Sequence, residues 1–329
     1  MPQLSALKIP KEFLDGKDLI SDRQATHEDY TIKSIADSSF ASSFRQIEEI
    51  HGVDRRCVAD LIVGQTTRPE YFTLEGINCF PLLHQLISSE LDCDRMDYLL
   101  RDSYFCGVSY GNFDLDWLLD NLEICVEADR AFLGISERAV VTFDDFLLSR
   151  NHMFVMVYFH YRSVCLEQLL LKYFKTAPGE YAIPSDIERY VEHDDHYLMK
   201  VLRNSHNPYA NAIVKNNIPA KIYESFNDQQ LATLEKIQQC LSQENVDFIR
   251  CSSSGRLSKY YNQAQSQKQF KIKVVRTLAG QKNKNYFNIE EATDLFQKFS
   301  KSHAVNRLHC DIDQLPYALQ IKILDLTRS

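Results

Sequence analysis

The segment from Leu86 to Gly111 constrains the fold most, because it places charged side chains at helical spacing within an otherwise apolar pattern. Asp94, Tyr98 and Asp102 recur at every fourth position and would share one face of a helix. An apolar stripe accompanies them, formed by Leu91, Met96, Leu99 and Leu100. The pattern predicts an amphipathic helix that packs on a core and presents two carboxylates and a phenol.

Two kinds of chemistry fit this helix. Carboxylate oxygens suit hard or borderline divalent cations, whereas the guanidinium groups of the flanking Arg95 and Arg101 suit phosphate oxygens. One helix could therefore carry a metal ligand beside a phosphate clamp. The alternative is a solvated face held by ion pairs such as Asp97 with Arg101.

The run DCDRMDYLLRD within this segment closely resembles the last conserved motif of HD-superfamily phosphohydrolases, specifically the deoxynucleoside triphosphate triphosphohydrolase branch. The resemblance implies that Asp94 is a metal ligand and that Arg95 faces the triphosphate. It also implies that Tyr98 and Asp102 contact the nucleotide sugar, with Asp92 in a supporting position. The implied fold is mainly α, an HD-domain-like helical bundle.

A second segment, THEDYTI from Thr26 to Ile32, looks like the histidine-glutamate helix of the same family. By that resemblance His27 would be the phosphate-proximal catalytic histidine and Glu28 its neighbour in the proton network. The dipeptide alone carries little information. The alternative interpretation of this segment is a helix that simply begins here, with its cap near Thr26.

A third segment, DFLLSRNHMFVMVYFHYR from Asp145 to Arg162, predicts a strongly apolar helix with Arg150, Phe154 and Tyr158 on one face. It resembles the family helix that sends an arginine and a tyrosine to the substrate. Arg150 and Tyr158 would then be substrate contacts, and His160 a weaker one. The alternative is a core helix with an arginine at one end.

The metal site of this family also uses an upstream histidine and an adjacent His-Asp pair, but no histidine precedes His27 in this chain. The first 26 residues resemble the variable insert that follows the His-Asp pair. We therefore expect an incomplete site for a divalent ion (Mg, Mn, Fe, Zn or Ni). Three explanations of the missing ligands are open. The true reading frame begins upstream, the protein is a shortened paralogue, or a second chain supplies the ligands.

A literal His-Asp pair occurs later, in EHDDH from Glu192 to His196. On a helix His193 and His196 would lie on nearly one side and could bind a cation with a neighbouring aspartate. The alternative is a solvated cluster that partly caps a helix.

The length and composition of the chain fit one large helical domain with an appended subdomain. We expect an HD core over residues 1–175 and an α-rich C-terminal subdomain over 176–329, because proline and glycine meet between Lys172 and Ser185. A short β-hairpin is predicted within Leu122–Thr142, around the polar Ala128-Asp129-Arg130 turn. The nine cysteines form no CxxC pair and no signal peptide is evident, which predicts a reducing, cytoplasmic location without a membrane span.

The chain carries a formal net charge of −8, which argues against general binding to nucleic acid. Yet residues 248–289 contain nine Lys or Arg and no Asp or Glu. This basic segment could bind a nucleotide effector or, with its aromatic residues, a single-stranded nucleic acid. Alternatively, it meets acidic groups of its own chain or of a symmetry mate.

The resemblance implies metal-dependent hydrolysis of deoxynucleoside triphosphates to nucleoside and triphosphate, which the missing His-Asp pair would compromise. The resemblance also implies a homo-oligomer with regulatory nucleotides at subunit junctions. One alternative is a non-catalytic nucleotide-binding or regulatory protein. Another is an HD phosphohydrolase that acts on a different nucleotide.

Overall fold

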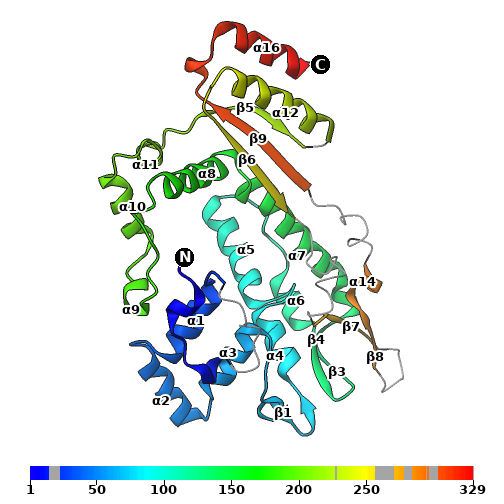
Figure 1. The fold of residues 1–329 in the computed structure, drawn as a ribbon. Helices are drawn as coiled ribbons and strands as arrows, with labels where there is room; N and C mark the ends of the chain where they lie inside the picture. Colours follow the sequence, from blue (N-terminus) through cyan, green and yellow to red (C-terminus); the bar gives the residue numbers. More distant parts are fainter. Residues whose placement is uncertain are drawn as a thin grey trace. The chain divides into compact units, whose positions relative to one another are not determined.

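The computed structural model describes residues 1–14, 23–226, 228–255, 270–277, 284–293, 295 and 303–328 of the chain. The chain divides into two compact units, each assembled from separate stretches of sequence. The first unit comprises Met1–Ser149, Ile183–Asp194 and Ser258–Lys298, and the second comprises Arg150–Ala182, Asp195–Leu257 and Phe299–Ser329. Helices dominate (Figure 1), which confirms the mainly α fold. The boundary expected near residue 175 falls inside the second unit.

The first unit is built on short helices. They are α1 (His27–Ala36), α2 (Ala41–His51), α3 (Arg55–Val63), α4 (Phe80–Ile87), α5 (Cys93–Cys106), α6 (Leu115–Asp120), α9 (Ile187–Tyr190) and α14 (Ile289–Ala292), with 3-10 turns at Leu4–Leu7, Lys11–Phe13, Pro69–Phe72 and Glu137–Ala139. α1 packs against α2, α3 and α9, α3 packs against α4, and α4 packs against α5. This succession links the two helices that carry most of the predicted site residues.

Local sequence sets the ends of α5. The Asp92 carboxylate accepts a hydrogen bond of 2.8 Å from the backbone N–H of Arg95 and so caps the first turn. Gly107 ends the helix in the left-handed region, with φ of +65°, where a side chain would be strained. Leu91, Met96 and Leu99 are buried, as the apolar stripe predicted.

A mixed sheet accompanies the helices of the first unit. Its strands are β1 (Thr73–Leu74), β2 (Ile77–Asn78), β3 (Leu122–Glu127), β4 (Arg130–Ser136), β7 (Lys273–Thr277) and β8 (Lys284–Asn288). β4 is the centre, because β2, β3 and β7 all pair with it. The predicted hairpin is confirmed as β3 and β4, joined through Ala128 and Asp129, which both have positive φ. It ends at Ser136, and the residues beyond it are helical.

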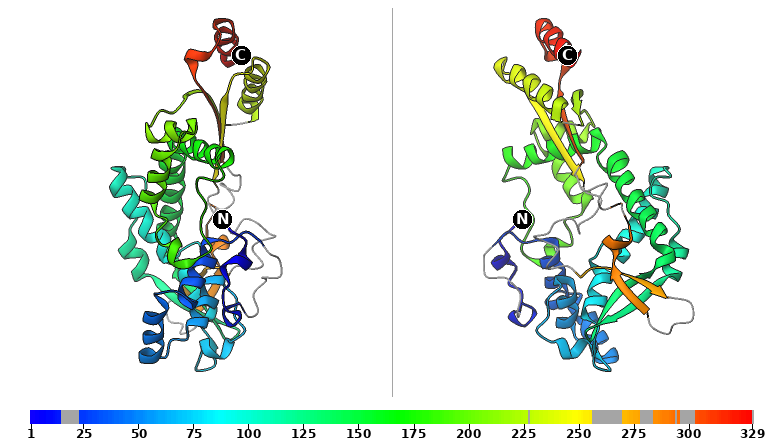
Figure 2. Two further views of the ribbon diagram at one scale, coloured as in Figure 1. Left: turned by 60° about the vertical axis from the view of Figure 1, so that its left-hand side comes forward. Right: turned by 90° about the vertical axis from the view of Figure 1, so that its right-hand side faces the viewer.

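The second unit places helices on both faces of an antiparallel sheet (Figures 1 and 2). The strands run in the order β5 (Ala220–Ser225), β9 (His303–Cys310) and β6 (Phe248–Gly255), and the helices are α8 (Tyr161–Thr176), α10 (Asp195–Asn204), α11 (Pro208–Val214), α12 (Asp228–Gln243) and α16 (Tyr317–Arg328). Cys251 packs with residues of α8, whereas the neighbouring strand residues Leu308 and Cys310 pack with α12 and α16. The sequence patterns did not predict this sheet.

The apolar segment 145–162 is not one α-helix. α7 (Val140–Met153) is followed by a π-helical turn at Phe154–Tyr158, and α8 begins at Tyr161. The N–H of Phe159 donates to the carbonyl oxygen of Phe154 at 2.7 Å, a spacing of five residues. The wider turn interrupts the α-helix that is predicted over this segment, although the rings of Phe154 and Tyr158 still meet, with centroids 5.2 Å apart.

Among the described residues, none of the helices has the length and hydrophobicity needed to cross a lipid bilayer.

Candidate functional site

Helix α5 presents the predicted polar face. Because Asp94, Tyr98 and Asp102 lie in one continuous α-helix, their spacing of four places them on the same side. Asp94 is exposed, and Tyr98 and Asp102 are half-buried. On the exposed flank, Arg101 Nη1 lies 3.3 Å from Asp97 Oδ2, so the alternative ion pair also forms. Arg101 Nε also lies 3.9 Å from Asp102 Oδ1, so the ion pair and the polar face of the helix adjoin each other.

The Arg95 side chain turns back toward the loop that precedes α5. Its guanidinium donates to the carbonyl oxygen of Ser89, and its Nε lies 3.7 Å from the carboxylate of Asp92. Nη1 lies 4.0 Å from the carboxylate of Glu90, which is buried. Arg95 thus offsets the charge of two buried acids. Its predicted contact with a triphosphate remains a prediction.

His27 and Glu28 begin α1 and form a pair. His27 Nε2 lies 3.1 Å from Glu28 Oε1, and the imidazole is 81% exposed. Partial burial raises the pKa of the Glu28 carboxyl, but hydrogen bonding to Thr26 and to the backbone outweighs it, so the pKa lies below its usual value. Glu28 is therefore ionised near neutral pH and suits a fixed negative charge better than a proton donor.

An open hollow of about 400 Å³ lies beside His27 and is lined mainly by aromatic and apolar side chains. The rings of Tyr30 and Tyr190 stack there at 4.0 Å, and the Tyr30 hydroxyl donates to the carbonyl oxygen of Pro184 at 2.6 Å. Such a surface suits a flat ring better than a phosphate.

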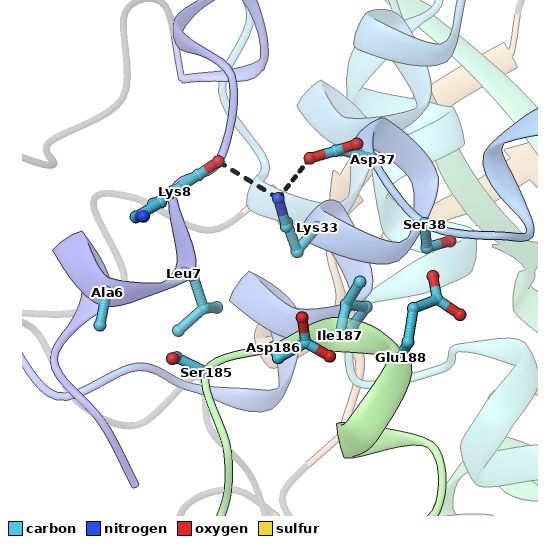
Figure 3. Close-up of a pocket in the computed structure, with 10 residues that line it drawn as sticks. All are labelled: Ala6, Leu7, Lys8, Lys33, Asp37, Ser38, Ser185, Asp186, Ile187 and Glu188. Atoms are coloured by element: carbon cyan, nitrogen blue, oxygen red, sulfur yellow. Dashed lines mark hydrogen bonds and ion pairs between the residues drawn. The ribbon is translucent and has the colours of Figure 1, made fainter.

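A second hollow of about 390 Å³ is more polar (Figure 3). Lys33 Nζ donates to Asp37 at 2.6 Å and to the carbonyl oxygen of Lys8 at 3.3 Å. Asp186 and Glu188 add negative charge to its lining. Because the Lys33 charge is already paired and acids surround it, this hollow is a poor site for a phosphate.

The side chains around Asp94 do not fit the metal centre that the resemblance implies. Among the described residues, one group brings three possible ligand atoms within 4.8 Å of one another, and it consists of Cys165, Cys251 and His309. Asp94 is not part of it. A single exposed carboxylate is a weak ligand set for a transition metal.

The EHDDH segment does not supply the missing ligands. His193 precedes α10, whereas His196 lies in the first turn of that helix, so the two do not share a helical face. Within the described part of the chain, neither histidine belongs to a three-ligand group. The observed arrangement corresponds to the alternative of a polar cluster at a helix start.

Arg150 and Tyr158 belong to the second unit, whereas the predicted residues of α1 and α5 belong to the first. Arg150 is buried in α7. Tyr158 is half-buried at the end of the π-helical turn, where its ring meets that of Phe154 at 5.2 Å in a T-shaped arrangement. Their substrate contacts remain predictions.

In the part of the chain that the structure describes, four of the nine basic residues of this segment form ion pairs with acids of the first unit. Lys271 lies 2.8 Å from Glu290, and Lys273 lies 2.8 Å from Glu127. Arg276 and Lys284 pair in the same way with Glu137 and Glu123. These pairs agree with the alternative of a basic face that meets its own chain. Arg256, Lys259, Lys268, Lys282, Tyr260 and Tyr261 lie outside the described residues.

The sequence patterns missed the cluster of Cys165, Cys251 and His309. Its members come from three distant segments, so no local spacing indicates it. They also missed the ion pair between Arg23 and Asp29, whose guanidinium and carboxylate approach to 2.6 Å. The sequence did indicate a role for Asp29 in capping, because it occupies the third helical position after the capping residue Thr26. Nothing in the local spacing indicated Arg23 as its partner.

Comparisons with known proteins give partial matches. No protein-family model matches the chain. The chain is 30% identical over 146 residues to the uncharacterised protein MJ1154 of Methanocaldococcus jannaschii, which covers 44% of this chain and 32% of that protein. It is 41% identical over 87 residues to the uncharacterised protein YwfO of Bacillus subtilis, covering 26% and 19%. The matches thus span less than a third of these relatives.

Two solved structures share the fold. A hypothetical protein from Aquifex aeolicus superposes with a TM-score of 0.68 at 22% identity, covering 92% of this chain and 72% of that chain. A phosphohydrolase from Bacteroides thetaiotaomicron superposes with a TM-score of 0.52 at 19% identity, covering 93% and 85%. At these identities the likeness establishes the fold and leaves the activity open.

Proposed function

We propose that the protein is a phosphohydrolase of the HD type that binds deoxynucleoside triphosphates through α5. The observation that carries the proposal is the polar face of this helix, where Asp94, Tyr98 and Asp102 stand in line above a buried apolar stripe. The fold shared with the Bacteroides phosphohydrolase supports it.

The side chains of α5 suit recognition of a nucleotide sugar. The Asp102 carboxylate can accept a hydrogen bond from a sugar hydroxyl, and the Tyr98 phenol offers a flat apolar ring with a polar end. On α1, the exposed His27 imidazole can exchange a proton with a phosphate oxygen or a water. Glu28 beside it supplies a fixed negative charge.

The proposal predicts that Tyr98→Phe and Asp102→Asn weaken nucleotide binding. Each change removes hydrogen-bonding capacity worth about 1 kcal/mol, so we expect roughly a five- to tenfold rise in the dissociation constant. Titration calorimetry with dGTP and a divalent ion measures it. Asp97→Asn, on the exposed flank of the same helix, is the matched control and should bind as the natural chain does. Unchanged binding in both site variants would contradict the proposal.

A second candidate is a nucleotide-binding protein that does not turn its ligand over. The observation in its favour is that, in the described part of the chain, Asp94 belongs to no group of three possible metal ligands. An assay for released triphosphate separates the two candidates. Binding with release supports the hydrolase, binding without release supports the regulatory protein, and neither binding nor release contradicts both. A homo-oligomer with effector nucleotides is a further part of the proposal.

A further inference from the structure

The second unit contains a buried cluster that the proposed nucleotide chemistry does not use. Cys165 lies on α8, Cys251 on β6 and His309 on β9, and none of the three has any exposed surface. One possible ligand atom from each residue lies within 4.8 Å of those from the other two. Three soft or borderline metal ligands therefore converge inside one unit.

The strand register explains this convergence. β6 and β9 pair antiparallel, with Ile249 opposite His309. In the same ladder, Cys251 lies opposite Arg307. Because side chains alternate between the two faces of a sheet, Cys251 and His309 project from the same face as diagonal neighbours. α8 covers that face and brings Cys165 into contact with it.

His309 has the orientation of a metal ligand. Its Nδ1 lies 3.1 Å from the carbonyl oxygen of Pro219, and a carbonyl can only accept, so Nδ1 carries the hydrogen. The neutral imidazole then has its lone pair on Nε2. Nε2 is buried and has no oxygen or nitrogen hydrogen-bond partner among the described residues, and the imidazole interacts with the Cys165 thiol. A backbone carbonyl that fixes the tautomer in this way is the usual support of a metal-bound histidine.

We propose that Cys165, Cys251 and His309 form a buried binding site for zinc. Thiolate and imidazole ligands select zinc over magnesium, manganese or calcium. On binding, each cysteine thiol releases its proton to solvent, and the zinc ion takes two thiolates and the neutral imidazole. The resulting centre has no net charge, which suits a buried position. Three protein ligands leave a fourth position for water or another small ligand.

The site would hold the elements of the second unit together. α8, β6 and β9 each supply one ligand, so the metal would crosslink a helix to the sheet that it covers. Two cysteines alone would be accounted for as small core residues. Such a core does not explain the fully buried His309 imidazole, because buried polar atoms normally bond to oxygen or nitrogen, whereas this ring lies beside two cysteine thiols.

Metal content of the purified full chain tests the proposal. We expect about one zinc per chain, resistant to dialysis, because structural zinc sites bind tightly. Cys251→Ser and His309→Gln should each reduce zinc content at least severalfold. The matched control is Cys310→Ser, since Cys310 is equally buried on β9 but faces the opposite cluster with α12 and α16. Asp94→Ala is a second control and should keep its zinc, which separates this site from a metal at α5.

A second measurement applies even if the ligand variants fail to fold. In the natural chain, cobalt(II) should replace zinc and give the intense absorption of thiolate-to-cobalt charge transfer. In mild denaturant, which makes buried thiols accessible, Cys165 and Cys251 should be alkylated more slowly before a chelator is added than after it. A natural chain that binds neither zinc nor cobalt overturns the proposal. So does a disulfide between the two cysteines, or undiminished zinc in folded Cys251→Ser.

Discussion

At the scale of single residues, the most informative side chain is Asp29, which is 3% exposed yet ionised. Burial raises the pKa of its carboxyl, but hydrogen bonds from Arg23 and Thr26 outweigh that effect and hold the pKa below the ordinary value of 3.8. A carboxyl with a lowered pKa in the folded state stabilises the fold above its unfolded pKa. That contribution is lost as the pH falls through the folded value.

We therefore predict that Asp29→Asn lowers the free energy of unfolding by about 2 kcal/mol at neutral pH, since it removes the charged partner of Arg23 and weakens the hydrogen bond that the Thr26 N–H donates. Urea denaturation as a function of pH measures the difference. It should be constant above about pH 5 and shrink below about pH 4, where the natural carboxyl becomes protonated. Asp97→Asn is the control, because exposed ion pairs contribute about 0 to 1 kcal/mol. Equal effects of the two variants would contradict the assignment.

At the scale of elements, α5 depends on a close approach by the loop that follows it. A Cβ added at Gly111 would overlap the carbonyl oxygen of Leu99 and lie 2.9 Å from Cβ of Ser103. Because the helix backbone cannot move aside, we predict that Gly111→Ala lowers the free energy of unfolding by about 1–3 kcal/mol. Chemical denaturation measures it, and Gly179→Ala serves as control, since its added Cβ meets nothing within 4 Å. A fully stable Gly111→Ala would show that the loop does not pack so tightly.

At the scale of the whole molecule, the ion pairs of the basic segment decide whether its charges are available to hold an oligomer together. Lys271 and Lys273 are paired with acids of their own unit, so their charges are already offset. We predict that reversing both to glutamate leaves the oligomeric state unchanged, with and without dGTP, and costs about 1 kcal/mol of stability. Light scattering and thermal unfolding check the two parts. Lys236→Glu, a charge reversal at an exposed position of α12, is the control for the effect of charge reversal by itself. Dissociation of an oligomer in the double variant alone would show instead that these two lysines take part in assembly.

Local patterns predicted some elements well. The spacing of four residues predicted the buried and polar sides of α5, and the β-branched residues around Ala128 and Asp129 predicted the hairpin. The same periodicity failed after Met153, where a π-helical turn interrupts the segment. A wider turn inserts one residue into the helical repeat, and no single residue type marks that insertion.

Local sequence patterns account for the mainly α character, the capped helices and the polar face of α5, because these features depend on contacts between residues a few positions apart. Only the tertiary structure brought together Cys165, Cys251 and His309, and only it paired the basic segment with its acids. Those groups come from distant segments, and their meeting depends on strand register and helix packing, which local spacing does not encode. Among the described residues, the tertiary structure places Asp94 in no group of three possible metal ligands.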